Sequence, residues 1–463
     1  MTDLTAALSA ADSSLDQSLE RLFGLLRIQS ISTDPAYAPE CRRAGQWLVD
    51  ELNSLGFEAS LRDTTGHPMV VAHHEGATPD APHYLFYGHY DVQPVDPLNL
   101  WTEPPFEPAI REIAPGRKAI TGRGSSDDKG QLMTFVEACR AWKAASGSLP
   151  CRITILFEGE EESGSPSLKP FLEANAEELK AECALVCDTG MWDTQTPAIA
   201  VALRGLVGEE ITIHAADRDL HSGLFGGAAA NPLHILSKIL ADLHDETGRV
   251  TLQGFYDGVE ETPAQILASW ESLGRTAEHF LGEVGLSVPS GEQGRSVLEL
   301  TWARPTAEVN GMWGGYTGEG FKTVIAAQAS AKVSFRLVGK QDPVQVRDAF
   351  RAHVEARLPA DCTVSYKPHG GSPAIQLPFD SPVVTKARAA LTDEWPKPAV
   401  MIGMGGSIPI VGDFQTYLGL QSMLCGFGLT DDRIHSPNEK YDLTSFSKGI
   451  RSWVRILDAL SRR

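Results

Sequence analysis

The stretch PHYLFYGHYD, residues 82–91, joins an apolar run to a cluster of polar side chains. Its first part, Pro82–Tyr87, is short and rich in aromatic and aliphatic residues, which is typical of a buried β-strand. Two further runs of this kind follow, RITILF at 152–157 and ALVC at 184–187. Segments with helical spacing separate them. This alternation predicts an α/β domain with a largely parallel central sheet.

Helical periodicity is clear near the start of the chain, where leucines recur from Leu15 to Leu26. A second run extends from Trp47 to Leu55, and Gly56 follows it as the residue that ends the helix. Later helices are predicted at 128–145, 167–180, 381–394 and 443–460, and a further strand at 398–403. Strands and helices therefore alternate in both terminal parts of the chain.

The pattern changes after Gly205. The predicted order is strand 209–215, helix 232–244, strands 322–327 and 332–338 as a hairpin, a helix opened by Asp342-Pro343, and strand 363–367. The order β-α-β-β-α-β is that of a ferredoxin-like domain, and 250–318 would be an insertion in it.

The α/β character returns after about residue 375, so a small domain interrupts a large one. We predict a large α/β domain with a mainly parallel sheet, formed by 1–205 and 376–463, and a smaller ferredoxin-like α+β domain at 206–375. A chain of 463 residues is long enough for two such cores.

Composition limits the partners. The net charge of −20 argues against nucleic acid and against anionic membrane surfaces. No run of about 18 apolar residues is present, as a membrane-spanning helix would require. The first residues contain no Lys or Arg, unlike a signal peptide. Seven cysteines without a CxxC pair fit reduced thiols, so we expect a cytoplasmic protein.

Polar residues follow the predicted strands, at the position where open α/β sheets place their ligand sites. After the first strand, alternation points His89 and Asp91 to the same side. A metal-bound imidazole commonly donates its other N–H to a carboxylate, which fixes its tautomer. The same pair is equally typical of a histidine that forms an ion pair near a strand end.

Two acidic stretches allow similar alternatives. In TGRGSSDDKG, residues 121–130, Asp127 and Asp128 are either helix caps that the dipole favours, or ligands, with Asp127 bridging two metal ions. FEGEEESG, residues 157–164, has four carboxylates within five positions, which repel one another unless solvent or cations intervene. One Glu would then bind metal while its neighbour takes a proton from water.

Asp188 after the third strand and His435 in a polar loop complete a joint ligand set. The five candidate ligands are His89, Asp127, Glu162, Asp188 and His435. A set of imidazoles and carboxylates without thiolate suits zinc, manganese or cobalt, and disfavours a structural cysteine-rich zinc site. One bridging carboxylate, with one further carboxylate and one His for each metal, gives two sites that share a water.

With these stretches in view, the sequence resembles the carnosinase and cytosolic nonspecific dipeptidase branch of the di-metal amidohydrolases. That family also includes glutamate carboxypeptidase, acetylornithine deacetylase and succinyl-diaminopimelate desuccinylase. The resemblance covers nearly the whole chain and rests on GHYDVQP (88–94), GRGSSDDKG (122–130), EGEEESGS (158–165), DLHSGLFGG (219–227), KTVI (322–325), SFRLV (334–338), GGSIP (405–409) and HSPNEK (435–440).

The resemblance implies roles for these residues. The five candidates match metal ligands, with Asp127 as the bridge and a cis peptide bond to Asp128. Asp91 matches the carboxylate that orients His89, and Glu161 matches the general base that activates water and then protonates the leaving amine. His221 matches a residue donated by the partner subunit of a homodimer to stabilise the oxyanion. Without the resemblance, His221 is an ordinary loop histidine.

Substrate contacts are implied in the same way. Arg336 matches the residue that binds the free carboxylate of the substrate, which a planar guanidinium does bidentately; alone, it reads as a surface arginine. Further matches to pocket positions are Thr323, Asn310, His369 and Gly406. Animal carnosinases carry His where Asn310 stands and Arg where Gly403 stands, so the pocket differs from theirs.

We therefore expect a homodimeric metallopeptidase with two divalent ions, zinc first and manganese or cobalt as alternatives. Its substrates would be dipeptides or short peptides with a free C-terminus, and the small domain would be a lid and dimerisation domain. An N-acyl or N-carbamoyl amino acid amidohydrolase is the alternative with the same chemistry. A catalytically silent metal-binding scaffold is the alternative of another class.

Overall fold

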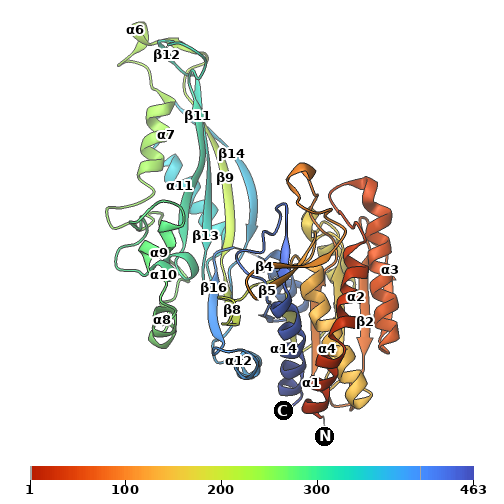
Figure 1. Cartoon of the computed structure of the whole chain (residues 1–463). Helices are drawn as coiled ribbons and strands as arrows, with labels where there is room; N and C mark the ends of the chain where they lie inside the picture. The colour runs from red at the N-terminus through yellow and green to blue at the C-terminus, as the bar shows by residue number, and fades with distance from the viewer. Residues whose placement is uncertain (1–2, 407, 463) are drawn as a thin grey trace. The chain divides into compact units, whose positions relative to one another are not determined.

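The computed structural model describes residues 3–406 and 408–462. The chain divides into two compact units (Figure 1). The first unit contains Met1–Val201, Leu377–Ile402 and Asp413–Arg463, and the second contains Ala202–Gln376 and Gly403–Gly412. The segment Gly403–Gly412, which the sequence analysis placed in the large domain, thus clusters with the second unit.

A nine-stranded mixed sheet forms the centre of the first unit, which confirms the predicted α/β class. Its order is β1 (Glu58–Arg62), β2 (Met69–His74), β6 (Arg152–Glu158), β3 (His83–His89), β7 (Cys183–Val186), β17 (Ser422–Leu424), β8 (Ala198–Leu203) and β15 (Ile375–Gln376), with β16 (Val400–Met404) paired to β8. The central strands β6, β3, β7 and β17 are parallel. The flanking pairs β1–β2, β2–β6, β17–β8 and β8–β15 are antiparallel, so the parallel character is confined to the middle.

Helices pack around this sheet, and α4 is buried along most of its length. The helices are α1 (Leu4–Ser13), α2 (Leu15–Leu26), α3 (Ala38–Ser54), α4 (Lys129–Ser146), α5 (Leu168–Ala174), α12 (Pro382–Glu394) and α14 (Leu443–Ser461). Helix α4 packs against β3. It also contacts α1 and α14, which lie beside it in Figure 1. The rings of Phe86 on β3 and Phe135 on α4 stack with centroids 3.6 Å apart, and Trp453 of α14 meets both edge-on. This aromatic cluster holds α4 against the central strands.

A separate three-stranded sheet brings two distant loops together. Its order is β18 (Lys440–Asp442), β5 (Arg117–Thr121) and β4 (Ala109–Ala114). Lys440 pairs with Thr121 in antiparallel register. The loop after Thr121 and the loop before Lys440 therefore leave neighbouring strands at the same place, although more than 300 residues separate them.

The second unit has a four-stranded antiparallel sheet in the ferredoxin-like order. The order is β11 (Thr306–Gly314), β13 (Gln328–Leu337), β9 (Gly205–His214) and β14 (Thr363–Ser372). Helices α7 (Pro232–Ala241) and α11 (Pro343–Glu355) pack on one face of the sheet. As expected, Asp342 caps α11: its side chain accepts hydrogen bonds from the N–H groups of Val344 and Gln345.

The predicted hairpin between 322–327 and 332–338 is wrong. The partner of β13 is β11, which lies in the segment that the sequence analysis assigned to an insertion. Residues 322–327 contain only the short β12 (Val324–Ile325), which pairs with β10 (Leu220–His221). The alternation in β11 is interrupted by a bulge between Val309 and Gly311, which hid the strand from a search for period-two patterns.

The insertion itself is shorter and helical. It contains α8 (Ala264–Glu271), α9 (Ala277–Gly282) and α10 (Val297–Trp302). Within residues 3–406 and 408–462, no helix combines the length and the apolar character that crossing a membrane requires.

Candidate metal centre

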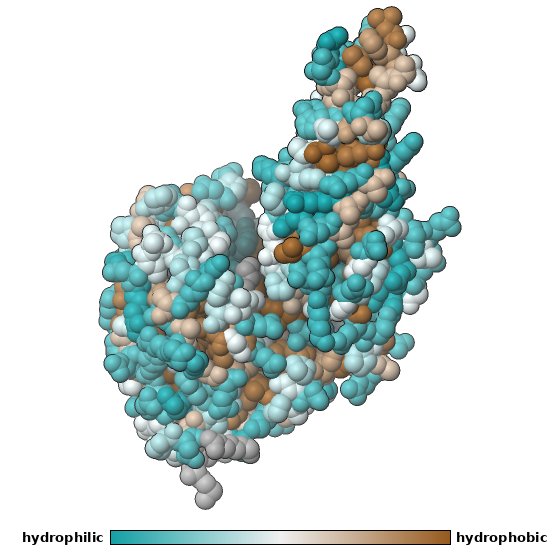
Figure 2. All heavy atoms as spheres, turned by 180° about the vertical axis from the view of Figure 1, so that it is seen from behind, coloured by the Kyte–Doolittle hydropathy of each residue, from teal (hydrophilic) through white to brown (hydrophobic). Residues whose placement is uncertain are grey.

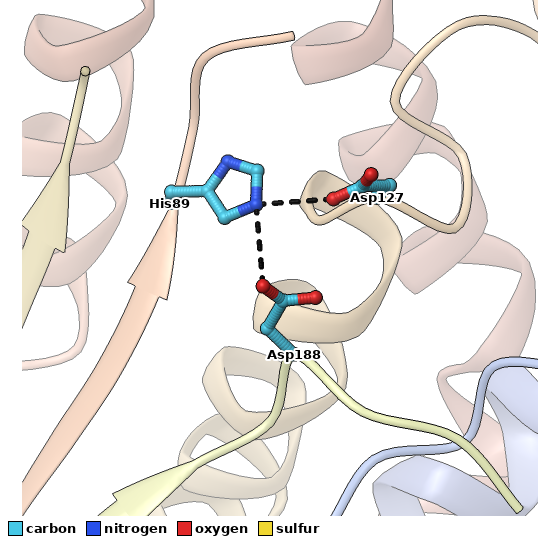
Figure 3. Close-up of side chains that lie close together, drawn as sticks. All are labelled: His89, Asp127 and Asp188. Carbon is cyan, nitrogen blue, oxygen red and sulfur yellow. Dashed lines mark hydrogen bonds and ion pairs between the residues drawn. The ribbon is translucent and has the colours of Figure 1, made fainter. Parts of the chain in front are cut away.

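Three of the candidate ligands meet at the carboxyl end of the parallel strands (Figure 3). His89 is the last residue of β3, Asp188 lies two residues after β7, and Asp127 lies just before α4. The Nε2 atom of His89 is 3.1 Å from Asp127 Oδ1 and 3.7 Å from Asp188 Oδ2. Neighbouring parallel strands end at the same sheet edge, which is why side chains from β3 and β7 converge.

A second group of three shares Asp127 with the first. The Nε2 atom of His435 is 2.9 Å from Asp127 Oδ2 and 3.1 Å from Glu162 Oε2. Glu162 lies in a short 3-10 turn after β6, and His435 lies in the loop before β18. The two carboxylate oxygens of Asp127 thus face different groups, which is the geometry of a carboxylate that bridges two metal ions.

The two groups differ in exposure. The side chain of His89 is completely buried, whereas that of His435 is 55% exposed. His89 ends β3 and Asp188 lies two residues after β7, whereas Glu162 lies in a 3-10 turn and His435 in a longer loop. The first group is therefore closed on a rigid frame, and the second is open to entering water or substrate.

Asp91 links both groups and lies where the sequence analysis expected it. Its buried carboxylate is 3.4 Å from Nδ1 of His89, and its backbone carbonyl is 3.2 Å from the same atom. The carboxylate also accepts hydrogen bonds from the N–H groups of Glu161, at 3.2 Å, and Glu162, at 3.0 Å. Asp91 thereby orients the His89 ring and holds the turn that carries Glu161 and Glu162.

The electrostatics favour added cations. Burial and the charge of Asp127 raise the pKa of Asp188 to about 7. Burial would also raise the pKa of Asp127, but hydrogen bonds from His435 and His89 outweigh it and lower that pKa. Hydrogen bonds to Asp127 and Glu162 raise the pKa of His435 to about 10.

No Lys or Arg in the part of the chain that the structure describes forms an ion pair with Asp127, Glu162 or Asp188. Buried carboxylates without cationic partners are costly. The donor set, the shared carboxylate and this charge deficit together fit two divalent ions.

Only part of the acidic stretch faces this centre. Glu158 accepts a hydrogen bond from the Tyr87 hydroxyl at 2.7 Å, and burial raises its pKa to about 8. Glu160 accepts from the N–H groups of His67 and Ser167. Burial also raises the pKa of Glu161. Glu158 therefore binds a tyrosine hydroxyl and Glu160 supports the backbone. Glu162 is a candidate ligand, and Glu161 is its neighbour in the chain.

The peptide bond between Asp127 and Asp128 is cis, as expected. Asp128 points away from the ligand atoms: its Oδ2 accepts a hydrogen bond from the N–H of His89 at 3.1 Å. Burial raises its pKa well above the ordinary range. The adjacent aspartates thus have different partners, which their sequence alone did not distinguish.

The other candidate residues belong to the second unit. His221 and Thr323 lie together on the β10–β12 ribbon, where the N–H of Ser222 donates to the Thr323 carbonyl. Both side chains are exposed, and Nδ1 of His221 accepts from the N–H of Gly223 at 3.0 Å.

Arg336 and His369 lie on the sheet face opposite the helices. Gly208 of β9 pairs with both Ser334 and His369, and Leu206 pairs with Arg336. The alternate positions of β9, such as Val207, are buried against the helices. His369 Nε2 is 3.6 Å from Glu210 Oε2.

Asn310 is the unpaired residue of the β11 bulge, and Gly406 is exposed. A side chain at Gly403 has no room: a Cβ there would lie 2.4 Å from Cβ of Trp302 in α10.

Sequence reasoning missed Glu439 and Arg123. Glu439 is completely buried, and its carboxylate accepts four hydrogen bonds from the loop that ends in Asp127. The letters HSPNEK contained this residue, but a Glu in a polar loop gives no sign of burial. Only the pairing of β18 with β5 brings it to that loop.

The family model for peptidase family M20/M25/M40 matches residues 85–459. The chain belongs to this family. It is therefore a peptidase, and the resemblance noted from its motifs is confirmed.

Known relatives match along almost their whole length. The Cys-Gly metallodipeptidase dug1 of Schizosaccharomyces pombe is 30% identical over 467 residues, which cover 97% of each chain. The Beta-Ala-His dipeptidase of Homo sapiens is 27% identical and covers 94% of this chain and 88% of its own. The solved structure of the di-peptidase Dug1p from Saccharomyces cerevisiae has a TM-score of 0.75 at 26% identity and covers 100% of both chains. The metallo-carboxypeptidase Sso-CP2 from Sulfolobus solfataricus has a TM-score of 0.77 at 29% identity, covering 96% of this chain and 99% of its own.

Proposed function

We propose that this protein is a di-metal dipeptidase that releases amino acids from dipeptides or short peptides with a free C-terminus. The observation that carries the proposal is the division of the Asp127 carboxylate between two ligand groups. His89 and Asp188 would complete one metal site, and Glu162 and His435 the other. The names of the relatives, Cys-Gly metallodipeptidase and Beta-Ala-His dipeptidase, support small peptides as substrates.

Two divalent ions, when bound, would polarise the scissile carbonyl and lower the pKa of a water molecule. Glu161 then accepts the proton of that water and passes it to the leaving amine. Its place beside Glu162, and the pKa that burial raises, suit a group that both takes and gives a proton. Asp91 keeps the His89 ring in place during this exchange.

The second unit would contribute the contacts to the substrate. Arg336 binds the free carboxylate, with His369 on the same face of the sheet, and Thr323, Asn310 and Gly406 lining the pocket. His221 donates a hydrogen bond to the carbonyl oxygen on which negative charge develops.

A homodimer is part of this proposal, with His221 supplied across the interface. Figure 2 shows hydrophobic surface at the end of the second unit that carries α6 (Ser222–Phe225) and β12. Leu224 is 77% exposed and Phe321 92% exposed there. Large exposed apolar side chains of this kind commonly mark protein–protein contacts. They flank the β10–β12 ribbon that carries His221, so a subunit bound there would contact this histidine.

Zinc is the first choice of metal, with manganese and cobalt as alternatives, because imidazole and carboxylate ligands suit all three. A cytoplasmic location is likewise proposed. All seven cysteines are free and buried, as in a protein that keeps its thiols reduced.

Incubating the purified, metal-loaded protein with a dipeptide panel and with N-acetyl, N-succinyl and N-carbamoyl amino acids tests the proposal. We expect turnover of dipeptides with a free C-terminus and little turnover of C-terminal amides, because Arg336 would lose its carboxylate partner. Turnover of acylated or carbamoylated amino acids alone would identify an amidohydrolase instead. A protein that binds two metal ions and hydrolyses nothing in the panel would be the catalytically silent scaffold.

A further inference from the structure

The loop Gly122–Asp127 reaches the metal centre without secondary structure of its own. Gly122 and Gly124 adopt positive φ angles of 142° and 80°, which glycine tolerates at low cost. Several backbone N–H groups of this loop point to one side, where strands offer them no partner. A loop of this kind needs an acceptor from elsewhere in the chain to hold Asp127 in place.

Glu439 is that acceptor. Its Oε1 accepts from the N–H groups of Ser126, at 2.9 Å, and Asp127, at 3.0 Å. Its Oε2 accepts from the N–H of Gly124, at 2.9 Å, and from the Arg123 guanidinium, at 2.7 Å. The carbonyl of Glu439 also accepts from the N–H of Gly122 at 3.1 Å. One buried residue thus satisfies most of the donors of the loop.

The same residue belongs to the loop that carries His435. Four positions separate the two, and Lys440 directly after Glu439 enters β18. Asp432, earlier in this loop, accepts a hydrogen bond from the Ser126 hydroxyl at 2.8 Å. Glu439 therefore ties the backbone of Asp127 to the segment that presents His435, and these two side chains face each other at 2.9 Å.

We propose that Glu439 is a positioning residue for the metal site formed by Asp127, Glu162 and His435. The proposal rests on the di-metal function proposed above. His89 ends β3 and Asp188 lies two residues after β7, so both depend less on this junction. Loss of the Glu439 carboxylate would therefore weaken the two metal sites unequally, with the greater effect on the site that contains His435.

A carboxylate is required here because all four partners of its oxygens are donors. An amide at 439 would turn its NH₂ group toward the N–H of Gly124 and the Arg123 guanidinium, which are donors too. Arg123 is 1% exposed and otherwise contacts the Pro94 carbonyl and the Trp101 ring, so it would lose its charged partner inside the protein. A shorter Asp would keep the charge but withdraw the acceptor oxygens.

The test measures zinc bound per protein chain at free zinc concentrations set by a chelator buffer, in wild type and Glu439→Gln. Removing a residue that supports metal ligands typically lowers metal affinity by about 10–100-fold. We expect a loss of that size for one ion and little change for the other. Anomalous scattering from crystals at limiting zinc should place the remaining ion beside His89 and Asp188.

Glu394→Gln is the matched control, because Glu394 is also a buried carboxylate with several cationic partners, Lys448, Arg451 and Arg455. It should lower the melting temperature of the metal-free protein and leave both zinc affinities unchanged. Folded Glu439→Gln protein that binds two ions as wild type does, or loses both equally, would overturn the proposal. If Glu439→Gln does not fold, Glu439→Asp decides by the same criteria. A wild-type protein that binds fewer than two ions would instead refute the di-metal function itself.

Discussion

The two units present their candidate functional side chains in opposite ways. In the first, His89, Asp91 and Asp127 are buried near the ends of parallel strands, and neighbouring backbone or side-chain groups hold each of them. In the second, His221 and His369 are exposed on a ribbon and on the uncovered face of an antiparallel sheet. A parallel sheet gathers side chains from several strands at one edge, whereas an antiparallel sheet spreads them over a face.

This difference has an energetic side. Burial of several carboxylates raises the free energy of the metal-free first unit, and divalent ions would offset it. The exposed residues of the second unit remain solvated and cost little to maintain. We therefore expect the first unit to govern metal binding and proton transfer, and the second to govern substrate and subunit contacts.

The largest expected effect belongs to the first unit. Glu161→Gln should reduce kcat by about 10²–10⁴-fold, the usual contribution of a general acid–base group, and leave the zinc content at two ions per chain. Steady-state kinetics and metal analysis on the same preparation measure both. Glu160→Gln is the matched control, because Glu160 supports backbone N–H groups of His67 and Ser167 and should change stability more than kcat. Full activity in Glu161→Gln would refute its role as the base.

A core substitution tests whether the second unit can be weakened without disturbing metal binding. Phe350 is fully buried in α11, with its ring 5.3 Å from that of Phe335. Phe350→Ala should lower the free energy of unfolding by about 3–5 kcal/mol, measured by urea denaturation. The zinc affinities at a temperature where the protein is folded should not change. Val344→Ala, at a 60% exposed position of the same helix, should change stability by less than about 0.5 kcal/mol.

The shared-site part of the proposal predicts complementation. His221→Ala removes a donor to the developing oxyanion and should lower kcat by about 10²–10³-fold. Arg336→Ala should be similarly weak because it loses the substrate carboxylate. Mixing the two variants should restore part of the activity, since some mixed dimers would contain one intact site. Mass-tagged protein would verify that the subunits exchange. If they exchange and no activity returns, the result would argue against donation of His221 across the interface.

The smallest expected effect is a pH dependence within the second unit. Burial lowers the pKa of His353 below its ordinary value of 6.5, with Arg357 adding to the shift and Asp242 opposing it. Its Nε2 lies 3.0 Å from the Ile239 carbonyl. As the pH falls below 6.5, the unfolded chain therefore binds more protons than the folded chain. The stability that neutral His353 contributes above this pH is then lost on acidification. Denaturation at several pH values should show that the free energy of unfolding falls less steeply on acidification in His353→Gln than in wild type. Equal slopes would contradict this role of His353.

The sequence allowed much of this to be predicted. Apolar runs such as RITILF and the helical spacing of leucines fixed the α/β class, because burial periodicity is a local property. Three of the candidate ligands, His89, Glu162 and Asp188, come after apolar runs that predict strands. The other two, Asp127 and His435, lie in polar stretches that predict loops. The strand β11 was missed because its bulge breaks the alternation, and the antiparallel edges of the large sheet have no distinct local signal.

The sequence by itself predicted the ligand types of the candidate metal centre: two histidines and three carboxylates, after predicted strands or in polar loops. Tertiary structure decided which carboxylates serve which purpose. Asp127 faces both histidines while Asp128 binds the His89 backbone, and Glu439 supports a loop more than 300 residues earlier in the chain. The physical reason is that a carboxylate's role depends on the donors that surround it. Those donors come from distant segments that only the folded sheets bring together.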